Sequence, residues 1–90
     1  MTQTIDISSE VLTQEVGGET VILDLKSETY FGLDEVGTRI WQLLADQEDI
    51  QTITATMLNE YDVEEDQVEK DIQNLLTQLD EAGIVTLNDD

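Results

Sequence analysis

The strongest constraint on the fold of this chain lies between Val21 and Leu44, where the spacing of apolar residues changes once. Before Asp34, apolar and polar residues alternate, which is typical of a strand with one buried side. After Asp34, the apolar residues follow the spacing of an amphipathic helix. Asp is a preferred N-cap residue, so we expect a β-hairpin to pass into a helix across this single residue.

The first half of the chain predicts a three-stranded meander. Three extended segments joined by turns are expected at Val11–Val16, Glu19–Leu25 and Tyr30–Leu33. Gly17–Gly18 marks the first turn, and residues 26–29 suit the second. In the middle strand, the alternation predicts an apolar side made of Val21, Leu23 and Leu25, with Asp24 on the other side. Gly32 predicts a bulge or a close backbone approach, and residues 1–10 are expected to be loosely ordered.

The second half predicts three helices. The first begins after Asp34 and ends near Ala45, and the second is capped by Asp49. The third has the clearest apolar face, formed by Val68, Ile72, Leu75, Leu76 and Leu79. Gly83 is a natural helix stop, and residues 84–87 suit a short final strand. We therefore expect one α+β domain over residues 1–90, with a three-stranded antiparallel sheet followed by three helices.

The charge balance excludes several classes of partner. The chain has 22 acidic and 3 basic residues, which gives a formal charge of −19. Nucleic acids and anionic membranes bind through Lys and Arg, so neither is an expected partner, whereas basic or neutral proteins are. The chain has no Cys and no His. Its N-terminal residues do not resemble a signal peptide and no apolar run would span a bilayer, so we expect a cytoplasmic protein.

No catalytic or metal-binding constellation stands out from the acidic background. The acidic run at residues 62–66 lacks the spacing and the Gly of a calcium-binding loop, so it is better interpreted as a solvated helix start. Ser8 and Ser9 have no base beside them to activate a hydroxyl. We therefore expect no catalytic residues, no metal and no cofactor, and we do not expect an enzyme.

The strand at Tyr30–Leu33 raises a question that the pattern alone leaves open. If this strand lies at the edge of the sheet, an extended peptide can add to it as a further strand, with a helix forming one side of the groove. Alternatively, Tyr30 and Phe31 are ordinary residues of the core and its rim. Periodicity alone slightly favours the second interpretation.

A resemblance to a known family bears on this question. The run LDLKSETYFGLDEVGTRIWQLL resembles the signature of PqqD-like RiPP recognition elements, and it is most similar to the stand-alone members that serve lasso-peptide pathways. Val11–Leu12, residues 49–53 and residues 71–85 resemble further parts of that family. The resemblance implies a winged-helix-like fold that binds the leader of a precursor peptide. The leader would add as a strand to the third strand, with the third helix as the other wall.

Carried over by position, the resemblance implies peptide-binding residues on both walls, namely Thr29, Tyr30, Phe31, Gly32, Leu33, Val68, Glu69, Ile72 and Leu76. Asp71 lies on the opposite flank of the third helix, and the helical wheel leaves open which flank contacts the leader. Val36, Ile40, Leu75 and Leu79 are interpreted as core. Glu28 departs from the family, whose hairpin turns often carry Gly at this point. A left-handed Glu there would cost about 1 kcal/mol relative to Gly.

The resemblance also implies partners. These are the leader of the precursor and a separate cysteine leader peptidase, with the cyclase as a further candidate. One alternative is a PqqD-type peptide chaperone that serves a radical enzyme. Another is an acidic protein-interaction module, whose binding to a basic protein would be lost at moderate salt.

Overall fold

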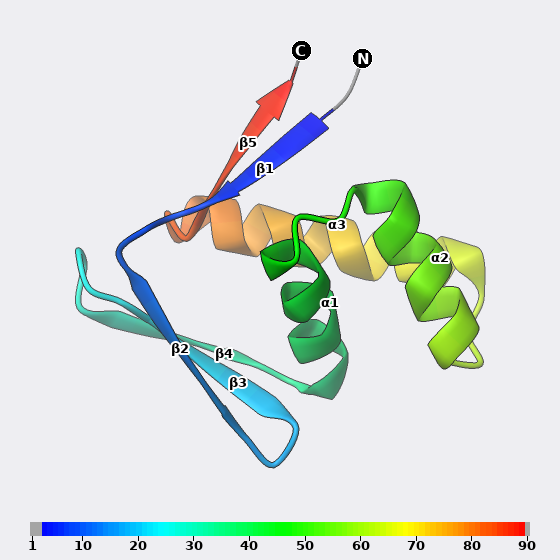
Figure 1. The fold of residues 1–90 in the computed structure, drawn as a ribbon, viewed down its shortest axis with the longest axis horizontal. Coiled ribbons are helices and arrows are strands. Elements are labelled where there is room, and N and C mark those ends of the chain that lie inside the picture. Colours follow the sequence, from blue (N-terminus) through cyan, green and yellow to red (C-terminus); the bar gives the residue numbers. More distant parts are fainter. Residues whose placement is uncertain (1–2, 90) are drawn as a thin grey trace.

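The computed structural model describes residues 3–89. In chain order its elements are β1 (Gln3–Ile7), β2 (Val11–Val16), β3 (Glu19–Asp24), β4 (Thr29–Leu33), α1 (Glu35–Ala45), α2 (Ile50–Glu60), α3 (Glu65–Glu81) and β5 (Val85–Asp89). Strands β2, β3 and β4 form an antiparallel sheet, and β1 pairs with β5 in a separate two-stranded ribbon. Helix α1 lies between the three-stranded sheet and α3 (Figure 1). The α+β expectation, with a three-stranded sheet followed by three helices, is confirmed.

The amino terminus differs from the expectation of a loosely ordered segment. Residues 3–7 form β1, which pairs antiparallel with β5 so that Ile5 lies opposite Leu87 and Ile7 opposite Val85. Ile5 and Ile7 pack against the core, so this segment is held by apolar contacts as well as by the ladder. Residues 1–2 lie outside the described part of the chain.

The side of the sheet that packs against the helices is the opposite of the side that the alternation predicted. The helix-facing side of β3 carries Thr20, Ile22 and Asp24, which are all buried, while Val21 is 42% exposed. The carboxylate of Asp24 is satisfied locally, because it accepts hydrogen bonds from the Lys26 backbone N–H at 3.1 Å and the Ser27 hydroxyl at 2.8 Å. A buried Asp can therefore replace an apolar residue here, since it organises the β3–β4 turn.

The expected bulge at Gly32 is also absent from the structure. Gly32 lies opposite Val21 in an uninterrupted β3–β4 register, and a Cβ built at this glycine has no neighbour within 4 Å. In the adjoining turn, Glu28 adopts a left-handed conformation with φ 59°. The turn therefore requires a left-handed residue at position 28, which is the conformation that glycine adopts most easily.

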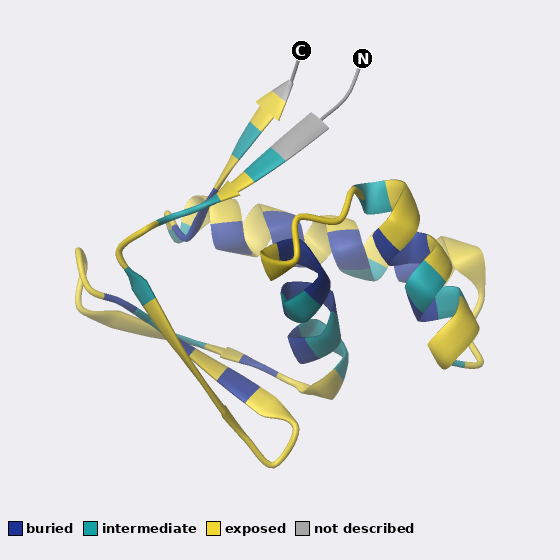
Figure 2. Cartoon of the chain, in the orientation of Figure 1, coloured by how far each residue is buried: buried dark blue, intermediate teal, exposed yellow. Residues whose placement is uncertain are grey.

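The core extends from β3 across α1 to α2 and α3, all of which carry buried residues (Figure 2). Its most deeply buried apolar residues come from every layer of the fold and include Ile22, Ile40, Ile53, Ile72, Leu76, Leu79 and Ile84. Helix α3 ends as predicted at Gly83, which has φ 78°. The Ile84 N–H donates to the Leu79 carbonyl at 2.9 Å and the Gly83 N–H to Asp80 at 3.1 Å, which is the Schellman pattern. This ending directs the chain into β5.

Candidate functional site

Strand β4 is an outer strand of the sheet and pairs only with β3 within the described residues. Its side chains alternate between two environments. Leu33 is buried and Phe31 is half-buried on the helix-facing side, whereas Tyr30 is 74% exposed on the outer side. An unpaired edge of this kind presents backbone N–H and C=O groups that a further strand can use.

A groove runs between this edge and α3. It encloses about 430 Å³ and is lined by Phe31, Gly32, Leu33, Asp34, Val36, Gly37, Ile40, Asp71, Asn74, Leu75 and Gln78. Strand β4 forms one wall and α3 the other, while the start of α1 forms the floor. Apolar side chains therefore lie at its base, and polar side chains of α3 lie at its rim.

A smaller apolar pocket continues the groove toward the end of α2. It encloses about 50 Å³ and is lined by Val36, Ile40, Met57, Tyr61, Val63, Val68 and Asp71. Three of these residues, Val36, Ile40 and Asp71, also line the main groove. The small pocket is therefore an apolar recess adjacent to the groove.

The sequence places the groove walls through local capping interactions. Asp34 directly follows β4, and its carboxylate accepts a hydrogen bond from the Gly37 N–H at 2.8 Å, which starts α1 at once. On α3, the Gln67 side-chain amide donates to the Asp71 carboxylate at 2.8 Å. This hydrogen bond between residues one turn apart holds the Asp71 side chain on the helix surface beside the groove.

Of the residues expected to bind a peptide, only some line this groove. Phe31, Gly32 and Leu33 do so from β4, and Val68 reaches the small recess. Thr29 and Tyr30 belong to the same strand but do not line the groove or the recess. Any contact that Thr29 and Tyr30 make with a peptide would therefore use their backbone N–H and C=O groups.

Three of the α3 residues expected to bind a peptide do not line this groove. Ile72 and Leu76 are 0% and 1% exposed and belong to the core, and Glu69 lines a different cavity between α2 and α3. The groove flank of α3 instead carries Asp71, Asn74, Leu75 and Gln78, which share one side of the helix by their spacing. The helical wheel alone leaves open which flank of α3 faces the groove, and the structure places the Asp71 flank there. Leu75, Val36 and Ile40 were interpreted as core, and all three also line the groove.

The electrostatics of the groove are acidic. Its lining contains two carboxylates, from Asp34 and Asp71, and no Lys or Arg. A bound segment with basic groups or free backbone N–H groups would complement these oxygens. Within the described residues, no group of three or more acidic side chains is arranged to hold a metal ion. None of the described helices is long and apolar enough to cross a membrane.

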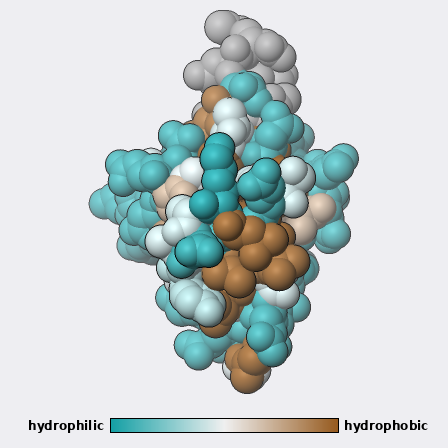
Figure 3. Space-filling model, turned by 90° about the vertical axis from the view of Figure 1, so that its left-hand side faces the viewer, coloured by the Kyte–Doolittle hydropathy of each residue, from teal (hydrophilic) through white to brown (hydrophobic). Residues whose placement is uncertain are grey.

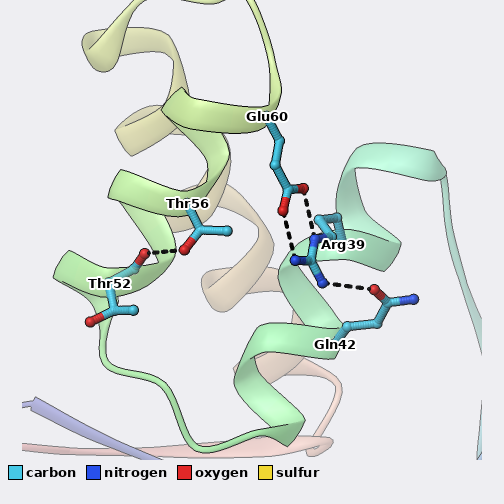
Figure 4. Close-up of polar contacts among 5 residues, drawn as sticks. All are labelled: Arg39, Gln42, Thr52, Thr56 and Glu60. Carbon is cyan, nitrogen blue, oxygen red and sulfur yellow. Dashed lines mark hydrogen bonds and ion pairs between the residues drawn. The ribbon is translucent and has the colours of Figure 1, made fainter.

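Outside the groove, an ion pair joins α1 to α2. The Arg39 guanidinium donates to both carboxylate oxygens of Glu60, at 2.8 and 2.7 Å, and also to Gln42 at 3.1 Å (Figure 4). This hydrogen bonding lowers the pKa of Glu60 and raises the pKa of Arg39. Within α2, the Thr56 hydroxyl donates to the Thr52 carbonyl at 2.8 Å. The ion pair therefore joins the two helices that support the recess.

Comparison with known proteins identifies the family. Residues 19–85 match the family model described as coenzyme PQQ synthesis protein D (PqqD). The chain belongs to the PqqD family. None of the curated proteins matches the chain.

Solved structures agree with this membership in the PqqD family. The complex "TbiB1 in Complex with the TbiA(beta) Leader Peptide" is 35% identical, with a TM-score of 0.87 over 94% of this chain and 99% of that chain. The complex "Lasso peptide synthetase B1 complexed with the leader peptide" is 28% identical, with a TM-score of 0.84 over 92% of this chain and 98% of that chain. Both of these similar structures are complexes with a leader peptide.

Proposed function

We propose that this protein is a non-enzymatic adaptor that binds the leader of a ribosomally made lasso-peptide precursor. The observation that carries the proposal is a strand edge, without a second partner among the described residues, that faces a helix across a groove with apolar side chains at its base, in a chain whose two solved neighbours hold leader peptides. The leader adds as a strand to the edge of β4. Backbone hydrogen bonds supply general affinity, and the groove selects alternate side chains of the leader.

The lining of the groove gives the selectivity. Phe31, Leu33 and Val36 receive apolar side chains of the leader, and the recess beside Tyr61 and Val68 receives one more. On the opposite wall, Asp71, Asn74 and Gln78 offer polar contacts along the leader. We assign the α3 side of the site to these three residues in place of Glu69, Ile72 and Leu76.

The adaptor presents its bound precursor to a separate cysteine leader peptidase in the cytoplasm. Holding the cleavage site near the peptidase raises its effective concentration there, as linked binding does. The adaptor itself needs no catalytic group for this role. The cyclase that acts on the released core peptide is a further candidate partner.

Titration of a synthetic leader from the pathway's own precursor tests the proposal. By calorimetry we expect a Kd between tens of nanomolar and a few micromolar, on the order of −8 to −10 kcal/mol. A scrambled leader of the same composition is the control. The affinity should largely survive moderate salt, because strand addition is not a surface charge effect. A Kd weaker than about 100 µM would exclude the function.

The family match favours one second candidate. A PqqD-type chaperone would deliver its peptide to a radical enzyme instead of a peptidase. The neighbouring genes separate the two candidates: a leader peptidase with an asparagine-synthetase-like cyclase supports the lasso pathway, and a radical enzyme without them supports the second.

A further inference from the structure

A strand bound beside β4 has two backbone edges, and β4 can satisfy one of them. The Leu25 N–H donates to the Glu10 carbonyl at 2.9 Å, and the direction of hydrogen bonding alternates along an antiparallel ladder. Through the uninterrupted β2–β3 and β3–β4 registers, this alternation directs the backbone groups of Tyr30 and Gly32 to the free edge of β4. These two residues therefore offer the hydrogen bonds of the first edge.

The second edge of such a strand faces α3. In a leader that pairs antiparallel, as the strands of this sheet do, each residue that puts its side chain into the groove directs its own N–H and C=O groups away from β4. Those groups meet the other wall of the groove, which is α3. Without partners there, they would lose the hydrogen bonds that they make to water in the free leader. The groove therefore needs hydrogen-bonding groups on α3 as well as on β4.

Two side-chain amides lie on this wall. Asn74 and Gln78 are exposed residues of α3, and both line the groove. An amide side chain carries donors and an acceptor, so each can bond to the C=O and the N–H of one strand residue. Within residues 3–89, neither amide is hydrogen-bonded to another residue, whereas the amide of Gln67 on the same helix donates to Asp71. The two groove amides are therefore available to a bound chain.

The spacing of the two amides fits an extended chain. Four residues of an α-helix rise about 6 Å, and one edge of a strand presents a residue about every 6.8 Å. Helix α3 extends in nearly the same direction as β4 in Figure 1, so the two repeats run along each other. Asn74 and Gln78 can therefore meet two leader residues that are two positions apart.

Apolar contact alone does not explain why a leader would lie in the groove. Exposed apolar residues also occur elsewhere on the molecule, including Leu12, Val21 and Leu25. Figure 3 shows apolar side chains gathered on the side of the molecule that carries the three-stranded sheet. The groove adds an open strand edge on one wall and side-chain amides on the other, and these fix where an extended chain lies.

We propose that Asn74 and Gln78 hold the second backbone edge of the bound leader, so that the leader is hydrogen-bonded along both edges. This inference rests on the proposed leader binding. Within the groove, Phe31, Leu33 and Val36 select the side chains of the leader, whereas the two amides position its backbone. The contribution of the amides to affinity is then independent of the leader side chains.

Variants of α3 give the first part of the test. Asn74→Leu and Gln78→Met remove the amides and keep side chains of similar size. Gln73→Met is the matched control, because Gln73 is an exposed residue of α3 that lines the cavity on the other flank. Calorimetry with the synthetic leader of the pathway's own precursor measures each Kd. We expect the Kd to weaken about three- to ten-fold for each groove variant, as loss of one hydrogen bond does, and less than about two-fold for the control.

Modified leaders then distinguish backbone contacts from side-chain contacts. In one series each leader residue is replaced by alanine in turn, and in a second series one backbone amide at a time is replaced by an ester. We expect the loss caused by Asn74→Leu to stay the same, within about two-fold, for every alanine leader. With the ester leaders, this loss should largely disappear at the positions that Asn74 holds. Gln78→Met should show the same effect two leader residues away.

Three results would overturn the inference. Groove variants that bind the leader as tightly as Gln73→Met would exclude the amides, and a loss that no ester leader changes would exclude backbone contacts. A loss that one alanine leader abolishes would assign the amide to a leader side chain. If Asn74→Leu is unfolded by circular dichroism, Asn74→Ala, which favours the helix, takes its place with the same expected loss. A wild-type protein that binds no leader fails at the first titration, which identifies a failure of the proposed function.

Discussion

Phe31 lies directly opposite the fully buried Ile22 in the β3–β4 ladder. Phe31 is itself half-buried, packs against the core and lines the groove. One side chain therefore contributes to both stability and the candidate site. A charged substitution such as Phe31→Asp changes both together, so residues that only line the groove give cleaner tests.

Asn74 and Gln73 are neighbouring exposed residues of α3 on different flanks. Asn74 lines the groove, whereas Gln73 lines the cavity between α2 and α3. We expect Asn74→Trp to fill the groove and weaken leader binding at least about ten-fold, with little change for Gln73→Trp. Leader titration of both variants measures this. The opposite order of effects would place the leader on the Glu69 flank of α3.

Ile72 should behave as a core residue. Its side chain is 0% exposed, so Ile72→Ala removes buried methyl groups and leaves a cavity. We expect the free energy of unfolding to fall by about 2–4 kcal/mol, with the leader Kd unchanged under conditions where the variant is folded. Urea denaturation and leader titration give the two values. A loss of affinity in the folded variant with unchanged stability would return Ile72 to the binding site.

The turn at Glu28 offers a stabilising substitution. Its φ of 59° is left-handed, and glycine adopts this region without the steric cost that a Cβ brings. We expect Glu28→Gly to raise the free energy of unfolding by about 1 kcal/mol. Denaturant unfolding is the measurement, with Glu28→Gln as the control for the lost charge. Equal effects of the two substitutions would attribute the gain to charge instead of backbone conformation.

The Arg39–Glu60 pair predicts a dependence of stability on pH. Because the pKa of Glu60 is lowered in the folded state, its stabilising effect is present above the ordinary Glu range and lost as pH falls through the lowered value. Wild type should therefore exceed Glu60→Gln in stability by a constant amount above about pH 6, and this difference should shrink as pH falls below the ordinary Glu pKa of about 4.3 and through the lowered value. Denaturant midpoints across this range measure the difference.

Arg39→Gln completes this experiment. Both side chains of the pair are about one-third exposed, at 32% and 34%, so solvent screening keeps the effect modest. In the Arg39→Gln background, Glu60→Gln should no longer produce a pH-dependent difference. A difference that persists without Arg39 would identify another partner for Glu60.

Features encoded by neighbouring residues could be predicted from the sequence. Asp34 and Asp49 cap their helices as expected, and each accepts a hydrogen bond from the backbone N–H three residues on. Gly83 ends α3 for an equally local reason. These signals depend on side chains acting on their own backbone, so no distant contact is needed to interpret them.

Features set by distant contacts could not be predicted in this way. Strand β1 depends on a partner at the other end of the chain, and Ile5 and Ile7 alone are a weak strand signal. The orientation of α3 about its own axis could not be predicted either, because its apolar residues cover more than one flank of the helix. Which flank faces β4 depends on how α1 and α2 pack, and only the assembled structure places Asp71 and Asn74 on the groove.

The β1–β5 ribbon has a consequence for protein engineering. Gln3 lies opposite Asp89 in this ladder, so the described chain enters and leaves the domain at the same place. Domains with adjacent ends tolerate insertion into surface loops of other proteins. Grafted there, the domain would make its host a peptide-controlled sensor, with strand β4 at the other end of the molecule from the points of attachment (Figure 1).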